Sequence, residues 1–285
     1  MAMSESTKPS QGEYVLIRSS AESERLERQF NAWQANIGYL LHPSIVQHDH
    51  MRIADVGTGT GIWLRELAKL LPPNTQLDGF DLSDSMFSRD NLPENIQFYH
   101  QNFLEPFPEK FLGKYDVLNV RVMVVALSSD EWEPAVRNLM TLLRPGGYLQ
   151  WVDCAAHDCV AKAPDGESLV DPKHARHYIE TFRKGMMAIG KTPNVAALNG
   201  IFQKSGLADC EEQIYPLVNP DAREDINSTV VDGITHFMLA ALNLGKEGLV
   251  GSREELMSLR TAALDDFSHG CYYCYDVHVV VGRKV

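Results

Sequence analysis

A glycine-rich turn joins a predicted strand to a predicted helix near the front of the chain. The turn is DVGTGTG, residues 55–61, which follows the apolar run at 51–57 and precedes a helical pattern at 62–71. A tight strand-to-helix turn needs unusual backbone dihedrals, and a ligand backed against the chain leaves no room for Cβ atoms. The exposed N–H groups at the helix start can meet a negative ligand group. The turn therefore predicts an α/β domain with a ligand site at the end of its first strand.

Short apolar runs and helical patterns alternate beyond this turn. Further strands are predicted at 75–82, 96–102, 115–125 and 148–154, with a helix over 132–143. Alternation of this kind indicates right-handed crossovers and a mostly parallel sheet. The later part is mainly helical, with helices at 174–189, 225–243 and 252–266 and strands at 210–218 and 275–284.

The domain organisation follows from these patterns. Residues 1–12 are polar and are expected to form a disordered tail. Residues 13–50 form a helical cap whose helix is ended by His42 and Pro43. Residues 51–285 form one domain, because no linker rich in Pro, Gly or Ser divides them. Within it, 51–153 is the cofactor-binding core, and 157–205 and 222–268 are helical insertions on the substrate side.

Composition excludes several function classes. The formal net charge of −12 opposes binding to nucleic acid or to an anionic membrane surface. The N-terminus lacks the apolar segment of a secretory signal, and the longest apolar run, 122–127, is too short to span a bilayer. Cys271 and Cys274 form a lone CxxC, which leaves a zinc or redox site open, but the five cysteines read better as small apolar residues. We expect a reduced, cytoplasmic protein without a metal.

The spacing between the glycine turn and a later acidic residue indicates which kind of ligand can bind. Asp81 lies 20 residues beyond Gly61, at the end of a predicted strand, where a carboxylate can accept hydrogen bonds from both ribose hydroxyls of an adenosine. The spacing differs from the dinucleotide fingerprint, because the third glycine comes one residue early and position 62 is Ile. Asp55 would repel a pyrophosphate and suits an ammonium group, such as the methionine end of S-adenosylmethionine. An NAD site and a plain surface turn remain as alternatives.

At this point the chain resembles a known family. The glycine turn, the Asp81 strand, QNF at 101–103, YDVLNVR at 115–121 and LLRPGGYLQW at 142–151 resemble the ordered motifs of class I S-adenosylmethionine-dependent methyltransferases. The front end, RSSAESERLERQF and then GYLLHPSI, resembles more narrowly the fungal methyltransferases of secondary metabolism, a group that includes regulatory relatives. The resemblance implies a Rossmann-like α/β fold with a seven-stranded, mostly parallel sheet, an antiparallel last strand and helices on both faces.

The resemblance also implies roles for individual residues. The methionine portion of the cofactor would lie against the glycine turn, the ribose on a carboxylate, and the adenine beside the third strand. Position 102 is often acidic in the family, whereas the amide here could accept a hydrogen bond from the adenine amino group and donate one to the ring nitrogen. The backbone carbonyl at the end of the fourth strand would face the methionine ammonium. The implied cofactor residues are Asp55, Gly57, Thr58, Gly59, Gly61, Asp81, Leu82, Met86, Asn102, Phe103 and Arg121.

Two residues before the capping helix extend this list. Tyr14 and Arg18 could close over the cofactor, although a solvated helix entry explains them equally well. The helical insertions carry apolar side chains that could form a lid over a hydrophobic substrate or could simply be core. These are Phe182, Met186, Met187, Ile189, Phe237 and Met238.

Methyl transfer requires little catalytic machinery. The sulfonium is already a good leaving group, so the protein chiefly aligns the reactants and excludes water. A base is needed only if the nucleophile holds a proton. His157, just past the fifth strand, is the first candidate base, His236 is a weaker one, and a surface or core role is open for both. Tyr272 and Tyr273 read as packing residues near the last strand.

The sequence thus favours an O- or N-methyltransferase acting on a small metabolite of aromatic, polyketide or peptide origin and releasing S-adenosylhomocysteine. The segment NVRVM lacks the Asn/Asp-Pro-Pro-Tyr/Phe signature of enzymes that methylate nucleobase amines. Two alternatives stay open, a fold relative that catalyses a cyclisation and a non-catalytic regulator. The acceptor atom and the oligomeric state are undetermined.

Overall fold

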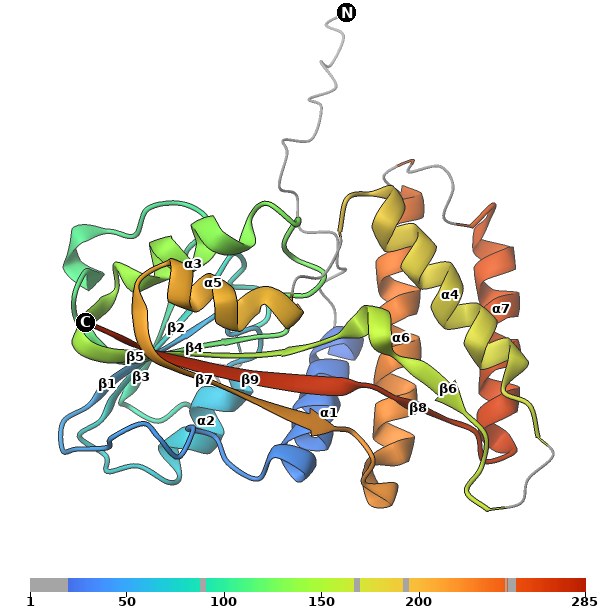
Figure 1. Ribbon diagram of the computed structural model, residues 1–285, viewed down its shortest axis with the longest axis horizontal. Coiled ribbons are helices and arrows are strands. Elements are labelled where there is room, and N and C mark those ends of the chain that lie inside the picture. Colours follow the sequence, from blue (N-terminus) through green and yellow to red (C-terminus); the bar gives the residue numbers. More distant parts are fainter. Residues whose placement is uncertain (1–19, 88–90, 167–169, 192–194, 244, 246–249) are drawn as a thin grey trace, which may run out of the picture.

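The computed structural model describes residues 20–87, 91–166, 170–191, 195–243, 245 and 250–285. The expected tail, Tyr14 and Arg18 lie outside these residues. Within them the chain forms a large sheet with helices on both faces, and a layer of helices beside one end of the sheet (Figure 1).

The large sheet has seven strands in the order β3-β2-β1-β4-β5-β9-β7. The strands β3, β2, β1, β4 and β5 pair in parallel, and β9 lies antiparallel to both β5 and β7. This confirms the expected fold, including the antiparallel last strand. The strands are β1 (Arg52–Val56), β2 (Gln76–Asp81), β3 (Ile96–His100), β4 (Tyr115–Arg121), β5 (Leu143–Cys154), β7 (Leu207–Pro216) and β9 (Asp276–Lys284).

Helices cover both faces of the sheet, which explains why the central strands read as continuous apolar runs. The helices α3 (Trp132–Met140) and α5 (Leu198–Lys204) pack against one face, where Leu118 and Trp151 are fully buried. The helix α2 (Ile62–Ala68) and the helix α1 (Ser20–Ile37) lie on the other, where Ile53 and Val117 are fully buried (Figure 1). Neighbouring residues of a strand thus serve opposite cores, as the pleat requires.

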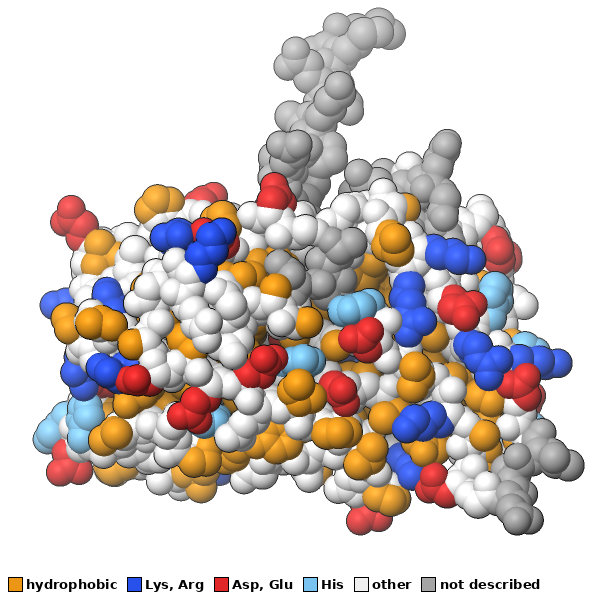
Figure 2. Space-filling view, viewed as in Figure 1, with side chains coloured by type: hydrophobic (Ala, Val, Ile, Leu, Met, Phe, Trp, Pro, Cys, Tyr) orange, Lys and Arg blue, Asp and Glu red, His pale blue; other side chains and the backbone are white. Residues whose placement is uncertain are grey.

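The helical layer is built from α4 (Lys173–Ala188), α6 (Arg223–Asn243) and α7 (Arg253–Ser268), together with a two-stranded sheet of β6 (Val160–Lys162) and β8 (Tyr272–Cys274). It has its own apolar core, and α6 also contacts α1. On the face shown in Figure 2, the Lys and Arg side chains over this layer are interspersed with Asp, Glu and His. Short 3-10 turns occur at Glu109–Phe111, Ala156–Asp158, Val195–Ala197 and Pro220–Ala222.

The observed elements differ from the sequence-based expectations at several places. The helix α1 ends at Ile37 rather than at His42, because Gly38 takes a left-handed conformation with φ of +83°. The helix α3 ends at Met140 rather than at 143, and β5 begins at Leu143 rather than at 148. The helix α5, expected in an insertion, packs beside α3 on the sheet. Tyr272 and Tyr273 lie in β8, a strand separate from the last one.

The cysteines are free thiols, and Cys271 and Cys274 are both buried at β8. Across the described ranges, no group of three potential metal-ligating side chains comes together. In the same part of the chain, no helix is both long and apolar enough to cross a membrane.

The third glycine of the turn holds α2 close to the sheet. Gly61 precedes the first residue of α2 with φ of +76°, and a Cβ built on it would lie 2.4 Å from Cζ of Phe98 in β3. The same ring crowds Gly79 of β2, and it stacks on Phe87 with ring centroids 4.6 Å apart. Only glycine therefore allows this approach of helix and strand.

We expect Gly61→Ala to lower the free energy of unfolding by about 2–4 kcal/mol, because it adds left-handed strain and forces the Phe98 ring to move. Urea denaturation measures this loss. The matched control is Gly113→Ala, since Gly113 has φ of +65° but no atom within 4 Å of a built Cβ. This control adds only the left-handed strain, and we expect its free energy of unfolding to fall by about 1–2 kcal/mol. Equal losses in the two variants would contradict the packing role of Gly61.

Candidate functional site

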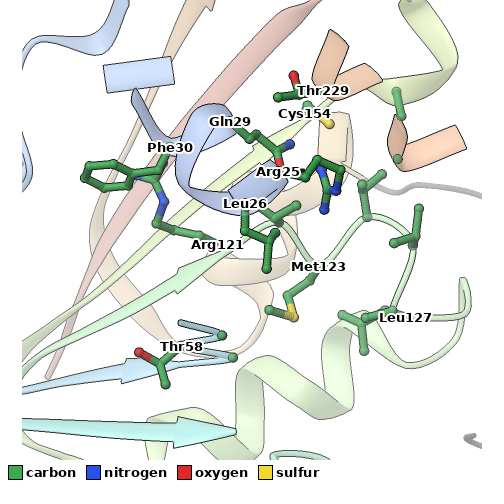
Figure 3. Close-up of a pocket in the computed structure, with 18 of the residues that line it drawn as sticks. Arg25, Leu26, Gln29, Phe30, Thr58, Arg121, Met123, Leu127, Cys154 and Thr229 are labelled. Atoms are coloured by element: carbon green, nitrogen blue, oxygen red, sulfur yellow. Dashed lines mark hydrogen bonds between the residues drawn. The ribbon is translucent and has the colours of Figure 1, made fainter. Parts of the chain in front are cut away.

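One pocket lies where β1, β2 and β4 end, between the sheet, α1 and the helical layer (Figure 3). Ligands of open α/β sheets bind at this carboxyl edge. Ten residues that the sequence assigned to the cofactor line it. They are Asp55, Gly57, Thr58, Gly59, Asp81, Leu82, Met86, Asn102, Phe103 and Arg121.

Asp55 is a buried carboxylate at the floor of the pocket. One of its oxygens accepts a hydrogen bond from Oγ1 of Thr58 at 2.7 Å, and the other accepts one from Nδ2 of Asn119 at 2.8 Å. Burial raises the pKa of Asp55 to about 6, against the opposing effects of these hydrogen bonds and of the Arg121 charge. A cation bound beside this carboxylate would favour its ionised form.

A chain of buried amides fixes Asp55 from behind. The strand register places Asp55 opposite Asn119, and Asn119 opposite Gln150. Nε2 of Gln150 donates to Oδ1 of Asn119 at 2.8 Å and to the carbonyl of Leu40, while its Oε1 accepts from the backbone N–H of His42. The sequence analysis did not predict this series of hydrogen-bonded side chains. The signal in the sequence was a polar residue within each of these apolar strands, at positions that the strand register brings side by side.

Asp81 ends β2 and ties it to the glycine turn. Its Oδ2 accepts from the backbone N–H of Gly59 at 2.9 Å, and its Oδ1 accepts from that of Ser83 at 3.0 Å. These two hydrogen bonds fix both oxygens of the carboxylate at the end of β2. The arrangement suits a ligand that presents two adjacent hydroxyls.

The backbone of the turn does not offer a nest of N–H groups. The N–H groups of Gly57 and Thr58 both donate to the carbonyl of Phe80, that of Gly59 donates to Asp81, and that of Gly61 donates to the carbonyl of Thr58. These four N–H groups are therefore occupied within the protein; the sequence-based expectation concerned the N–H groups at the start of α2, which Gly61 directly precedes. A pyrophosphate would find occupied donors and the Asp55 carboxylate, which argues against a dinucleotide.

The glycines of the turn have different roles. Gly57 has φ of +72°, and a Cβ on it would lie 2.1 Å from the methyl group of Met123, so it keeps the pocket floor open. Gly59 has φ of +56° and lies under Leu26 of α1. Gly61 was expected beside the methionine portion, but it does not line the pocket, because it packs against Phe98.

At the edge of the pocket nearest β3, Asn102 and Phe103 lie where the adenine was expected. Oδ1 of Asn102 accepts from the backbone N–H of Leu104 at 3.0 Å, and its Nδ2 lies 3.4 Å from a carboxylate oxygen of Glu105. Each atom of the amide keeps further hydrogen-bonding capacity. Nδ2 of Asn138 donates to the carbonyl of Phe103, which anchors this loop.

The fourth strand ends in a strained turn. Val122 has φ of +59°, a left-handed conformation that is rare for a β-branched residue. The buried Asp153 holds the turn, since its Oδ2 accepts from the backbone N–H of Met123 at 2.7 Å. Burial raises the pKa of Asp153 to about 6 despite such hydrogen bonds. Strain of this kind persists only where the surroundings impose it.

Arg121 lines the pocket beside this turn. Its guanidinium lies 5.1 Å from the ring centre of Phe30 and 5.7 Å from that of Trp33, both on α1. Burial lowers the pKa of Arg121 to about 10, partly offset by the charges of Asp55 and Asp153. The sequence pointed to the backbone of this residue, whereas the structure adds a cation stacked on α1.

The candidate bases lie outside the pocket. His157 is in the 3-10 turn after β5, where only its neighbour Ala156 lines the pocket, and its Nε2 lies 3.4 Å from Asp158. Its side chain is 45% exposed. His236 lies 2.6 Å from Oε2 of Glu22 and does not line the pocket either.

Among the six apolar residues considered for a lid, Phe182 lines the pocket. Met186, Phe237 and Met238 are buried in the core of the helical layer, and Ile189 packs against it. Met187 is 68% exposed. Most of these residues are therefore core, and of the six only Phe182 contributes to the apolar wall of the pocket.

Comparisons with known proteins show which proteins this chain is similar to. A family model described as a methyltransferase domain matches residues 53–147. Methyltransferase grgD of Penicillium sp. is 34% identical over 98% of this chain and 99% of its own. N-methyltransferase tcpN of Claviceps purpurea is 33% identical over 47% of this chain and 49% of its own.

Solved structures share the fold at low identity. A phosphoethanolamine N-methyltransferase of Haemonchus contortus, in complex with S-adenosylhomocysteine, superimposes with a TM-score of 0.51 at 15% identity, over 88% of this chain and 52% of that one. The relative matched along its whole length, the domain model and the architecture at the carboxyl edge agree. The chain therefore belongs to the class I S-adenosylmethionine-dependent methyltransferases.

Proposed function

We propose that this enzyme transfers a methyl group from S-adenosylmethionine to oxygen or nitrogen of a small, largely apolar metabolite. The observation that carries the proposal is a single pocket with two kinds of wall. Acidic residues and the glycine turn line one end, and mostly apolar side chains from β5, α4 and α6 line the other. The apolar side chains include Cys154, Ile179, Phe182 and Ile234.

The acidic end is proposed to hold the cofactor. Asp55 would face the methionine ammonium, Asp81 would accept the ribose hydroxyls, and Leu82, Met86 and Phe103 would pack beside the adenosine. The occupied N–H groups of the turn and the buried carboxylate support this ligand over a dinucleotide. When bound, the cofactor supplies a methyl group on a positively charged sulfonium.

The protein's own contribution is alignment and exclusion of water. The described side chains that line the pocket include carboxylates at the cofactor end and Arg25, Gln29 and Thr229 at the other, and none of those described is a histidine. This composition supports an acceptor that does not depend on a strong protein base. Several relatives are named N-methyltransferases, which adds support for nitrogen as the acceptor atom.

Titration calorimetry with S-adenosylhomocysteine and with NAD tests the cofactor assignment. We expect the first to bind and NAD not to bind. Asp81→Ala should raise the dissociation constant of S-adenosylhomocysteine by about 10- to 100-fold, because it removes hydrogen bonds to a charged group. Asp84→Ala, which changes an exposed carboxylate three residues away, is the control and should leave binding unchanged. Binding of NAD, or an unchanged affinity in Asp81→Ala, would contradict the assignment.

The pH dependence of binding tests the role of Asp55. Since its pKa in the free protein is raised to about 6, the carboxyl is mostly protonated at pH 5. A ligand with an ammonium group should therefore bind more tightly as the pH rises from 5 to 7. Asp55→Asn should bind weakly with a flat profile over this range. A profile that keeps its slope in Asp55→Asn would assign the titration to another group, such as Asp153.

The raised pKa values of Asp55 and Asp153 also affect the stability of the protein. A carboxyl group whose pKa is raised by folding stabilises the protein below its unfolded pKa, and this contribution is lost as the pH rises through the folded pKa. We therefore expect Asp55 and Asp153 to lower the free energy of unfolding of the free protein at pH 7 relative to pH 5, as measured by urea denaturation at the two pH values against Asp55→Asn. Bound S-adenosylhomocysteine should reduce the difference, because its ammonium favours the ionised form of Asp55.

A further inference from the structure

A buried arginine lies at the end of the pocket away from the glycine turn. Arg25 of α1 is 5% exposed and lines the pocket together with Gln29, Cys154 and Thr229. Figure 3 shows these four side chains gathered on one side, with Thr58 of the glycine turn on the opposite side and Met123 between them. The proposed cofactor residues therefore leave this cation unused.

Neighbouring side chains fix the orientation of the Arg25 guanidinium. Its Nε and Nη2 donate to the two carboxylate oxygens of Glu22 at 2.9 and 2.7 Å. Its Nη1 donates to Oε1 of Gln29 at 3.1 Å. A guanidinium has five N–H groups, and within the described residues these three hydrogen bonds occupy three of them. Two N–H donors remain in a group that lines the pocket.

The charge of Arg25 is already balanced. Burial alone would raise the pKa of Glu22, but hydrogen bonds from His236 and Arg25 bring it below its ordinary value, so Glu22 is ionised. Asp55 and Asp81 add negative charge at the far end of the pocket. Burial raises the pKa of the Cys154 thiol, which is therefore neutral. The hydrogen-bond donors at this end of the pocket thus belong to a guanidinium that is already paired with an ionised carboxylate.

The surroundings of Arg25 leave room for a ligand atom. Gly233 lines the pocket from the middle of α6, one turn after Thr229, and a Cβ on it would lie 3.5 Å from Nη1 of Arg25. A glycine inside a helix weakens the helix, so its benefit here is the space beside the guanidinium. The adjoining wall is apolar and includes Ile179, Phe182 and Ile234.

We propose that Arg25, oriented by Glu22 and Gln29, is a carbonyl-binding subsite for an uncharged, largely apolar methyl acceptor. The inference rests on the proposed function, since it names the acceptor's chemistry at the same pocket. The pairing of Arg25 with the Glu22 carboxylate favours the neutral oxygen of an amide or a ketone over a second carboxylate. The apolar wall takes the rest of the acceptor, and the carbonyl fixes its orientation toward the cofactor end.

Fluorine NMR titration of protein saturated with S-adenosylhomocysteine tests the subsite. The probes are 4-fluorobenzamide, 4-fluorobenzoate and fluorobenzene, which share one ring and differ in the oxygen group. We expect the amide to bind most tightly. Arg25→Met should reduce the preference for the amide over fluorobenzene by about tenfold, as expected for hydrogen bonds to a charged donor. The affinity for S-adenosylhomocysteine should stay within about twofold, a small change on the free-energy scale.

Two further variants control for loss of folding. Arg28→Met removes a half-exposed arginine of the same helix that pairs with Asp232, and it should leave the probe preference unchanged. Gly233→Ala leaves Glu22, Gln29 and Arg25 in place but adds a methyl group beside Nη1. It should fold and lower the preference for the amide. If Arg25→Met does not fold, this variant decides the outcome.

Three results would overturn the proposal. An unchanged amide preference in folded Arg25→Met or, should that not fold, in Gly233→Ala would remove the subsite. Tighter binding of the benzoate than of the benzamide would show recognition of charge. A weakened affinity for S-adenosylhomocysteine with unchanged probe preference would assign Arg25 to the cofactor carboxylate. If the wild type does not bind S-adenosylhomocysteine, the proposed function fails, and the probe titration on the free protein still decides the role of Arg25.

Discussion

The site depends on one buried carboxylate held in place across three strands. Asp55 lies almost wholly out of solvent, with its two oxygens bonded to Thr58 and Asn119. Asn119 is in turn fixed by Gln150, which binds the segment after α1. An isolated charge in such a place is unfavourable, and the raised pKa of Asp55 expresses that penalty. The free protein thus contains a negative group whose ionised form a cationic ligand would stabilise.

The backbone around this carboxylate is equally constrained. The left-handed Val122 and the glycine turn form two sides of the pocket floor. Asp153 ties the first of these to β5, and Asp81 ties the second to β2. Carboxylates at strand ends therefore serve as structural anchors for the loops that shape the pocket. Because the loops are anchored before any ligand arrives, binding needs little reorganisation of the backbone.

Much of this could be predicted from the sequence, for physical reasons. The strands β1 and β4 are covered on both faces, so they read as continuous apolar runs, and the glycines need their left-handed dihedrals. The acids at positions 55 and 81 followed from strand ends that meet at one edge. The expectations that the structure corrects depend on packing between segments that are distant in the sequence. Gly61 was assigned to the ligand because sequence cannot show the Phe98 ring above it. The strands β6 and β8 span only three residues each, too few for a periodic signal.

The sequence also did not predict the hydrogen bonds that join Asp55, Asn119 and Gln150, nor the end of the pocket that Arg25 lines. Asn119 and Gln150 become partners only through strand register, and Arg25 reaches the pocket only because α1 packs against α6. His157 was a candidate base because it follows β5 in the sequence. In the structure, the turn after β5 brings Ala156, and not the side chain of His157, to the pocket. Side-chain direction in irregular segments is set by local backbone geometry, which composition and spacing do not encode.

A crystal structure of the protein with S-adenosylhomocysteine tests whether Asp55 and Asp81 hold the cofactor. We expect the ligand to occupy only the acidic end of the pocket, with its ammonium beside Asp55 and the end of β4 and its ribose hydroxyls on Asp81. The end bounded by Arg25, Gln29 and Thr229 should remain open for a second molecule. A ligand seated against Arg25, or with its ribose away from Asp81, would contradict this expectation.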